Sequence, residues 1–569
     1  MENRDRDWDF HLRTLSSSTR DFTVANDPSS DPALLHSVKK LYELCKAENS
    51  EDLVARFYPQ INKLFQRAVA SLAQSRTSNG LLLLAILQFF LDFGEMVLHD
   101  ADPSLRAFFR SCLSREFSDP VVAEATLDFL NMNKKKLLTS FPTLLPQFFP
   151  LLLKLIAWNG ERLEKSFLKV FPGLMSPGSF LPLFPSLVDF PILVVALEKV
   201  ERSSGSLIGS SIASIQKSAA PEMLLALMDE AYTGSTIGDG GGDSESDDSN
   251  TMDAADPLFL ELLKDENDGL AERHWTSPGM ATALQAAINT PQSDRLKQIL
   301  KMAPRILDVY FSIGLRGVNN SLICALIPLL MTKNATIFPD KSFSYEIRKR
   351  LLEFMLAAFQ RSPDFIALLK KPIMDRLGEA YDSPAKTELA LQLCWAIGEH
   401  GGGGGSHKDA ARELFESLEL LLYENLSSSR LGLRQESALS TDSETFSRKS
   451  SQSRLLCFVV TAIAKLATHH RELLPRARVS LGKVARSRIS DARVWRRARD
   501  YLGLMSEPAI CLSVLGPSRP SCGQTQNPGI VNWSEGRTKM IAHIPFYILG
   551  EHEGPPFHDF SFSDILPRR

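Results

Sequence analysis

The clearest hydrophobic pattern in the chain runs from Ser383 to Leu426. Apolar residues recur at helical spacing on two faces of its first half and form one stripe in its second half. The first half carries Leu389, Leu393, Ala396 and Ile397 on one face and Leu391, Cys394 and Gly398 on the other, and the second half carries Ala411, Leu414, Phe415, Leu418 and Leu422. Five glycines, Gly401–Gly405, separate the halves and interrupt helical structure. The stretch therefore predicts an antiparallel helical hairpin with one inner and one outer helix.

One line of the first predicted helix stays mostly polar. It consists of Glu388, Gln392, Trp395 and Glu399. Because the other faces are apolar, we expect neighbouring elements to cover this helix on two sides, with Trp395 beneath one of them. We expect Gly398 and Trp395 to serve packing, since glycine allows a close approach between backbones.

Helix-start signals recur along the chain. A side chain that can cap a helix, followed by proline, marks the first turn, because proline lacks the N–H that would be unpaired there. Such pairs precede apolar stretches at Asp31-Pro32, Asp102-Pro103, Asp119-Pro120, Asp256-Pro257, Ser277-Pro278, Ser362-Pro363 and Ser383-Pro384. Alternating apolar and polar runs, which would predict strands, are absent before about residue 505. The pattern predicts an all-α fold, a HEAT/armadillo-like α-solenoid of about ten two-helix units with roughly 40–47 residues each.

Shifts in composition divide the predicted solenoid. We expect a polar, disordered N-terminus (1–31), a first solenoid half (32–233), an acidic linker or loop (234–256), a second half (257–426), a Ser-rich loop (427–453), terminal helices with a basic region (454–505) and a Pro- and aromatic-rich tail (506–569). The linker holds seven acidic residues and neither Lys nor Arg, so it cannot bury enough apolar surface to order itself. Ala254 stands where a calcium-binding loop starting at Asp243 needs glutamate, so no calcium site is expected.

Composition narrows the class of protein. Hydrophobic residues make up 44% of the 569 residues and charged residues 23%, which are the proportions of a globular protein. A net charge of −3 excludes a globally basic nucleic-acid-binding protein. The seven cysteines include no Cys-x-x-Cys pair, so they indicate neither a zinc module nor a disulfide framework, and we expect buried, reduced thiols.

Targeting and membrane signals are weak. The N-terminus is polar and charged, so we expect no secretory signal. The most apolar stretch, Leu81–Leu98, contains Gln88, Asp92 and Glu95, whereas a spanning helix needs about 20 mostly apolar residues. We therefore expect a buried core helix there, and a cytosolic protein.

One region is strongly basic. Residues 471–500 hold ten basic and three acidic side chains, a local charge of +7. The candidate contact residues are Arg476, Arg478, Lys483, Arg486, Arg488, Arg493, Arg496, Arg497 and Arg499. Two interpretations stay open: a solvated outer face of the last helices, or a surface for an acidic partner such as anionic lipid, an acidic protein segment or nucleic acid. The region lacks interleaved aromatic residues that would stack on bases, which disfavours nucleic acid.

The Ser-rich region contains candidate phosphorylation sites. Ser450 and Ser451 directly follow Arg448 and Lys449. A plain surface linker has the same composition. Two interpretations therefore stay open, a regulatory segment that is phosphorylated and a linker without a regulatory role.

Catalytic motifs are missing from the sequence. It contains no phosphate-binding Gly-x-x-x-x-Gly-Lys loop, no His-Glu-x-x-His and no Gly-x-Ser-x-Gly. The glycines at 240–242 lie among carboxylates, which would repel a phosphate. We expect no enzyme activity, no cofactor and no metal.

The segment Cys394-Trp-Ala-Ile-Gly-Glu-His400 resembles the Trp-x-x-Gly-Glu-Tyr signature of the adaptins, the large subunits of vesicle-coat adaptor complexes. Trp395, Gly398 and Glu399 match the signature, and His400 replaces its tyrosine. The following helix, from Ala411 to Glu424, is similar to the zeta-subunit family of the fifth adaptor protein complex, in a plant-like version. The resemblance is strongest over residues 380–426.

This resemblance implies a non-enzymatic large subunit. Its partners would be a beta-type large subunit, a medium subunit and a small subunit, with spatacsin- and spastizin-like proteins beside them. The implied role is protein sorting at late endosomes and lysosomes, through peripheral membrane association and without nucleic acid. The alternative is a helical-repeat scaffold in nucleic-acid metabolism, such as DNA repair, that uses the basic region 471–500.

Overall fold

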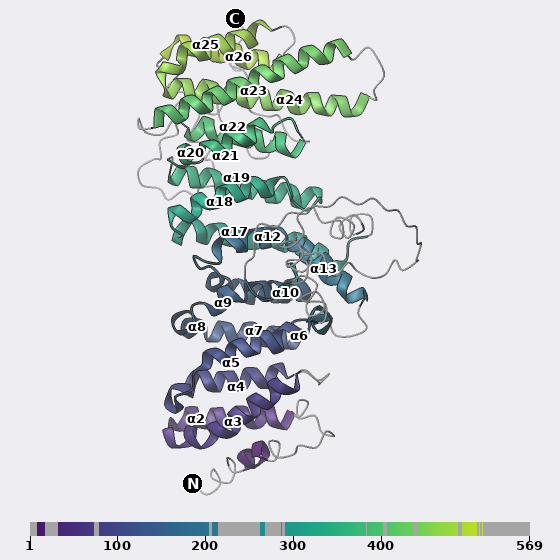
Figure 1. Ribbon diagram of the computed structural model, residues 1–569, viewed down its shortest axis with the longest axis vertical. Helices are drawn as coiled ribbons and strands as arrows, with labels where there is room; N and C mark the ends of the chain where they lie inside the picture. Colours follow the sequence, from purple (N-terminus) through teal and green to yellow (C-terminus); the bar gives the residue numbers. More distant parts are fainter. Residues whose placement is uncertain are drawn as a thin grey trace, which may run out of the picture. The chain divides into compact units, whose positions relative to one another are not determined.

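The computed structural model (Figure 1) describes residues 8, 10–16, 32–72, 79–203, 208–213, 262–267, 286, 291–362, 364–382, 384–401, 407–435, 442–487, 492–508, 511 and 515. These residues form helices and turns, and none of them lies in a strand. The predicted all-α fold is confirmed. The predicted N-terminal segment lies largely outside the described residues, as do the acidic linker and most of the tail.

The chain divides into two compact units, Met1–Val309 and Tyr310–Arg569. The helices of the first unit are α2 (Pro32–Glu48), α3 (Glu51–Ser71), α4 (Gly80–Phe93), η2 (Gly94–Val97), α5 (Ala101–Ala107), the π-helical η3 (Phe108–Leu113), α6 (Ser114–Glu116), α7 (Pro120–Met132), α8 (Lys134–Ser140), α9 (Leu144–Gln147), α10 (Phe149–Asn159), η4 (Gly160–Leu163), α11 (Glu164–Val170), η5 (Phe171–Leu174), α12 (Phe180–Val188), α13 (Phe190–Ser203) and most of α17 (Asp294–Gly317).

The second unit begins within α17. Its helices are α18 (Asn320–Asn334), α19 (Lys341–Arg361), α20 (Asp364–Leu368), α21 (Lys370–Gly378), α22 (Pro384–His400), α23 (Lys408–Gln435), α24 (Asp442–His469), η7 (Arg471–Leu473), α25 (Leu474–Arg486) and α26 (Ala492–Ser506). Within this unit α19 packs against α22, α22 against α24, and α24 against α26, so helices two or three apart in the chain become neighbours (Figure 1). Some consecutive helices also pair, as α23 does with α24 and α25 with α26, but α22 has its main contacts with α24 rather than with α23. The antiparallel hairpin expected over Ser383–Leu426 is therefore not confirmed.

Several helices start where the sequence signals predict. The Asp119 side chain accepts hydrogen bonds from the amides of Val121 (2.8 Å) and Val122 (3.3 Å), and Pro120 opens α7. Helix α22 starts at Pro384 and ends at His400, just before the glycine run. These starts follow from local chemistry, because a capping oxygen pairs amides that have no partner inside the helix.

The apolar stretch at residues 80–97 lies in the core of the first unit. By length and composition Gly80–Val97 could cross a membrane, as could the bent pair α12 and α13 if it formed one span. In this fold 61% of Gly80–Val97 is buried, and Leu83, Ile86 and Leu87 are fully covered. Asp92, which interrupts the stretch, accepts a hydrogen bond from the Tyr42 hydroxyl at 2.7 Å. The helix thus packs as the core helix expected from its polar interruptions.

The boundary between the compact units differs from the division expected at residues 234–256. Residues beyond that linker pack back onto the first unit: Lys154 pairs with Asp265 at 2.8 Å, Arg295 with Glu201 at 2.7 Å, and Arg305 with Glu164 at 2.8 Å. The described residues just beyond the linker therefore belong to the first unit, and the boundary falls inside α17. A change of composition can mark a linker, but it does not show which compact unit the residues after the linker join.

The expected Ser-rich loop at residues 427–453 is largely helical. Helix α23 continues to Gln435 and α24 begins at Asp442, which leaves a much shorter connection. The physical reason is that serine costs a helix only about 0.5 kcal/mol per residue, so a serine-rich sequence does not stop one that has already started. Ser450 and Ser451 consequently lie on the helical backbone of α24.

The cysteines in the described part of the chain are free thiols. Cys45, Cys112, Cys394, Cys457 and Cys511 are buried, and Cys324 is partly buried. Burial raises the pKa of the Cys394 thiol well above its ordinary value. These residues behave as small apolar side chains, as expected.

Alanine at Glu116 should lower the free energy of unfolding by about 1.5–3 kcal/mol, because the buried carboxylate accepts charge-assisted hydrogen bonds from two amides at the start of α4. These are the Asn79 and Gly80 amides, each at 3.0 Å, and Glu116 is 7% exposed. Urea unfolding of the whole chain, with hydrogen exchange of α4 peptides, measures the change. The control is Glu124→Ala, whose side chain is 46% exposed and pairs with Arg162 on the surface. It should change stability by less than about 1 kcal/mol, and equal effects of the two variants would contradict the capping role.

Candidate interaction surface

Two of the three signature residues, Gly398 and Glu399, lie in the packed interface between α22 and α24. A Cβ atom added at Gly398 would sit 3.2 Å from the Ala462 Cα atom, closer than ordinary van der Waals contact. Trp395 is 6% exposed, and Glu399 forms an ion pair with Lys465. The structure thus makes Gly398 and Glu399 parts of a helix–helix contact and buries Trp395 on the same helix.

The polar line of α22 is matched by polar residues on its neighbours. Glu399 pairs with Lys465, and Glu388 lies 3.9 Å from the Arg454 guanidinium. Each pair is separated by 66 residues, so α22 and α24 run parallel in a fixed register. Between the two acidic residues, Gln392 accepts a hydrogen bond from the Asn334 side chain at 3.0 Å.

The Lys465–Glu399 pair is nearly removed from water. The Lys465 side chain is 3% exposed and that of Glu399 is 10% exposed. Desolvating two charges offsets much of their attraction, so such a pair adds little net stability, but either charge left alone is costly. The main effect of the pair is therefore on register: sliding α22 along α24 would leave a buried charge without its partner, which destabilises the shifted arrangement.

The basic residues of α25 are partly committed to contacts within the chain. Arg476 pairs with Glu416 at 2.8 Å and with Glu419 at 2.6 Å, and these acids raise its pKa above the ordinary arginine value. Arg478 donates to the main-chain oxygen of Met505. Lys483 lies 4.3 Å from the centre of the Tyr423 ring. Arg486 donates to the Gly482 oxygen, one turn earlier, at 3.1 Å.

The basic residues of α26 divide into buried and exposed positions. Arg497 is 3% exposed and donates to the Thr461 hydroxyl at 3.2 Å, so it belongs to the core and cannot contact a partner as the sequence suggested. Arg499 lies over the Trp495 ring at 4.9 Å. Arg496 and Arg499 are exposed and Arg493 is half-buried. Arg488 lies outside the described residues.

A mixed basic and apolar surface remains on the outside of α25. Arg478, Lys483 and Arg486 are exposed there around Val479, which is 54% exposed. Leu420 of α23 is 60% exposed, and hydrogen bonds from Ser480 and Arg476 to Glu419 join its helix to α25. We call these five residues the α25 face. Exposed apolar groups on helices that also expose cations suit an acidic partner or an anionic lipid surface.

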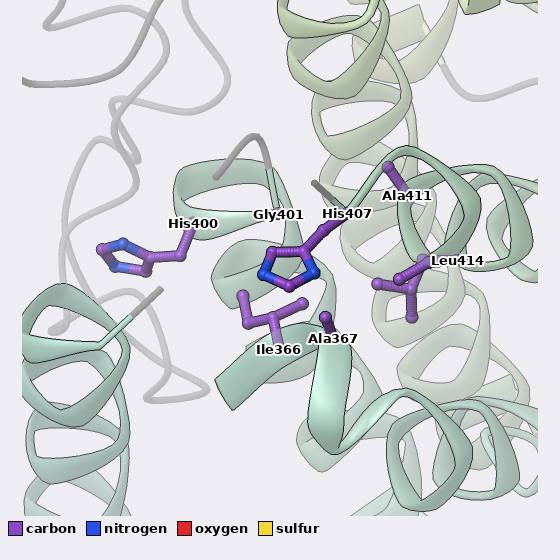
Figure 2. A pocket seen from close by; sticks show the side chains of 8 residues that line it. Ile366, Ala367, His400, Gly401, His407, Ala411 and Leu414 are labelled. Atoms are coloured by element: carbon purple, nitrogen blue, oxygen red, sulfur yellow. The ribbon is translucent and has the colours of Figure 1, made fainter. Parts of the chain in front are cut away.

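A small pocket lies next to the glycine run. Ile366, Ala367, His400, Gly401, His407, Ala410, Ala411 and Leu414 line about 220 Å³ of space that is partly open to solvent. Figure 2 shows the His407 ring between the side chains of Ile366 and Leu414, with His400 set apart from it. His407 Nε2 is 2.7 Å from a carboxylate oxygen of Asp364. Among the described residues no group of three or more His, Cys, Asp or Glu side chains could hold a metal ion, and the apolar lining suits packing more than chemistry.

Sequence reasoning missed a polar contact in the first unit. The Lys154 ammonium, 1% exposed on α10, donates to the Leu263 main-chain oxygen and to an Asp265 carboxylate oxygen at 2.8 Å. A signal was available, because Lys154 is the one charge in the run Phe148–Ala157. A lysine in such a run indicates a buried charge that needs an acceptor from elsewhere.

Comparison with known proteins identifies relatives of the chain. A family model described as an AP-5 complex subunit in vesicle trafficking matches residues 29–154, and one described as AP-5 complex subunit zeta-1, C-terminal TPR repeats, matches residues 245–527. Together they cover more than half of the chain. The second description specifies TPR repeats, two-helix repeats related to the HEAT or armadillo type expected from the sequence.

Two curated relatives carry the same description. The mouse protein named AP-5 complex subunit zeta-1 is 23% identical over 531 residues, which is 90% of this chain and 59% of the mouse protein. The human protein of that name is 24% identical over 454 residues, or 77% of this chain and 51% of the human protein. The chain thus spans little more than half the length of these relatives.

Removing one partner of the buried pair should be costly, and removing both should not. We expect Lys465→Met to lower the free energy of unfolding by about 3–5 kcal/mol, because Glu399 is left charged and buried. The double variant Lys465→Met with Glu399→Leu should recover most of that loss, because the apolar side chains fill the same volume without desolvating a charge. Urea unfolding of the whole chain provides the comparison.

The exposed pair Lys370–Glu413 is a matched control, with side chains 37% and 42% exposed. Lys370→Met should change stability by less than about 1 kcal/mol. A double variant as unstable as Lys465→Met would show that the charges themselves stabilise the interface.

Proposed function

Because the chain belongs to the family of AP-5 complex zeta-1 subunits, we propose that it acts as a large subunit of a heterotetrameric vesicle-coat adaptor in endosomal and lysosomal protein sorting. The role is one of binding rather than catalysis. The family match over both halves of the chain is the observation that carries the proposal, and the stack of helices gives it a physical basis. Such stacks present extended surfaces that hold other protein chains.

The proposed partners are those of an adaptor complex. They are a beta-type large subunit, a medium subunit and a small subunit, with spatacsin- and spastizin-like proteins as associated factors. The proposed location is the cytoplasmic side of late endosome and lysosome membranes, with peripheral attachment. No nucleic-acid partner is proposed, and the alternative role in DNA repair, which the basic region suggested, is not adopted.

Affinity purification of the tagged chain from its own cells tests the assignment directly. The expected result is co-purification of medium- and small-chain adaptor subunits in amounts comparable to the tagged chain. Recovery of nucleic-acid-processing proteins instead, together with steeply salt-dependent binding of DNA or RNA by the purified chain, would contradict it.

The α25 face is the proposed membrane contact of the subunit. Its cations are exposed at the edge of the second unit's last helices, and Val479 and Leu420 supply apolar contact between them. Anionic lipid attracts each nearby basic side chain with about 1 kcal/mol, so three of them have a measurable effect. Arg493, Arg496 and Arg499 extend the basic surface onto α26, whereas Arg497 is excluded by its burial. Phosphorylation at Ser450 or Ser451 on α24 would add negative charge to the same unit and weaken such attachment.

Reversing three charges of the α25 face should weaken binding to anionic vesicles. For Arg478→Glu, Lys483→Glu and Arg486→Glu combined, we expect at least about a tenfold loss of affinity for phosphatidylserine-containing liposomes in a flotation assay, given about 1 kcal/mol per basic side chain. The loss should shrink as salt rises, because exposed charges are screened. Recovery of the adaptor subunits should be unchanged.

A triple variant of exposed lysines in the first unit is the matched control. Lys39→Glu, Lys165→Glu and Lys301→Glu make the same change in net charge on other helices. If both triple variants lose liposome binding equally, total charge rather than the α25 face is responsible. If only the α25 variant loses the adaptor subunits while liposome binding persists, the face contacts a protein partner.

A further inference from the structure

A short segment of the first unit, residues 262–267, packs against α9, α10 and η3. The nearest described residues on either side are 213 and 286. Leu262 and Leu263 are 5% and 0% exposed, so the segment contributes two apolar side chains to the core. Polar contacts with α9, α10 and η3 also hold the segment, and we call the surface of these three helices that makes them the groove.

Lys154 forms the floor of this groove. Its ammonium group donates to the Leu263 oxygen and to the Asp265 carboxylate, and both acceptors come from the docked segment. Burial lowers the pKa of Lys154, and the charge of Asp265 opposes that shift. A buried ammonium without these acceptors would carry a large desolvation cost. The groove therefore requires an occupant that presents a carbonyl and a carboxylate together.

A second cation recognises the next residue of the segment. Arg110 of η3 donates two hydrogen bonds to the Glu266 carboxylate, at 2.6 and 3.0 Å, and the Gln147 side chain donates a third at 2.5 Å. These bonds lower the pKa of Glu266, the Arg110 bond being the largest cause. The paired geometry favours a carboxylate at this position over any neutral group.

Two main-chain hydrogen bonds fix the direction of the segment. The Leu151 amide, in the first turn of α10, donates to the Asp265 oxygen at 3.3 Å, and the Asn267 amide donates to the Gln147 oxygen at 2.7 Å. Both groups of the first unit lie at helix ends, where backbone groups have no partner inside the helix. Any peptide backbone could make these two bonds, so the leucine and the two acids carry the specificity.

We propose that this groove is a binding site for partner peptides of the form Leu-x-Asp-Glu, and that residues 262–267 occupy it in cis as a competing ligand. The contacts of the groove that recognise the segment are a buried lysine, a bidentate arginine and two helix-end groups, all supplied by the first unit. They select side-chain chemistry and do not require that the ligand belong to the same chain. This proposal rests on the first unit alone and does not depend on the adaptor assignment.

Occupancy in cis determines how the site would behave. A tethered ligand has an effective concentration in the millimolar range, so it suppresses weak competitors. The apparent affinity for a partner peptide is reduced by the fraction of chains whose groove is empty. Weakening the segment should therefore raise the affinity for an added peptide, whereas a purely structural segment would leave no usable site behind.

Peptide binding to the full chain tests the proposal. The probe is a fluorescein-labelled peptide of residues 259–268, followed by fluorescence anisotropy. A chain in which the segment carries Leu263→Glu and Asp265→Ala should bind the probe at least about tenfold more tightly than the wild-type chain, since its groove is free. No gain in affinity, with circular dichroism showing an intact fold, would overturn the proposal.

A charge exchange at Arg110 distinguishes the groove from non-specific binding. Arg110 is 52% exposed, so Arg110→Glu should leave the fold intact. Added to the segment variant, it should weaken the wild-type probe at least about tenfold and restore binding of a probe carrying Glu266→Arg, because the ion pair is formed in reverse. If both probes bound equally to both chains, the probes would be binding outside the groove, and the proposal would be overturned.

A milder release variant covers the case in which the double change unfolds the chain. Glu266→Gln in the chain removes one charge from a side chain that is 26% exposed and leaves Leu263 in the core. It should give a smaller gain in probe affinity that Arg110→Glu again abolishes. A wild-type chain that elutes as a dimer and is separated into monomers by the probe would assign the docked segment to a second copy, against occupancy in cis.

Discussion

The close parallel contact between α22 and α24 orders the second unit. Gly398 allows the two backbones to approach, and the Glu399–Lys465 pair penalises any register in which either charge is buried alone. Helix α24 also contacts α23, α25 and α26, so its position on α22 determines where the last helices lie. Gly398 and Glu399, two of the residues that resemble the adaptin signature, therefore explain the packing of the unit rather than forming a surface for partners.

Charged residues in this chain have two distinct uses. Some are taken into helix interfaces, as with Lys465, Lys154 and Arg497, each 3% exposed or less. There they need acceptors from other helices or segments, and they link parts of the chain that are distant in sequence. Others stay exposed on the α25 face, where they keep contacts within the chain and can also meet an anionic surface. A basic stretch in the sequence mixes both uses, since one turn of helix carries residues to opposite faces.

The hydrophobic pattern and cap chemistry predicted the fold class and several helix starts. These features are local, so a few neighbouring residues are enough to produce them. The expected loop at 427–453 was wrong for the same reason: serine content is a weak local preference, and helices that have begun continue through it. The candidate surface was predicted only in part, because Arg497 and Arg499 stand two residues apart and differ in burial.

By itself the sequence determined where several helices start, that the chain builds a helical-repeat scaffold, and that residues 471–500 are basic. Tertiary structure alone decided which helix covers the polar line of α22, which arginines face water, and where the compact units divide. It also placed Asp265 on Lys154 across 111 residues of chain. The physical reason is that helix formation depends on hydrogen bonds between residues four apart. The partner of a buried charge, in contrast, is set by how distant segments pack, and no local pattern encodes that.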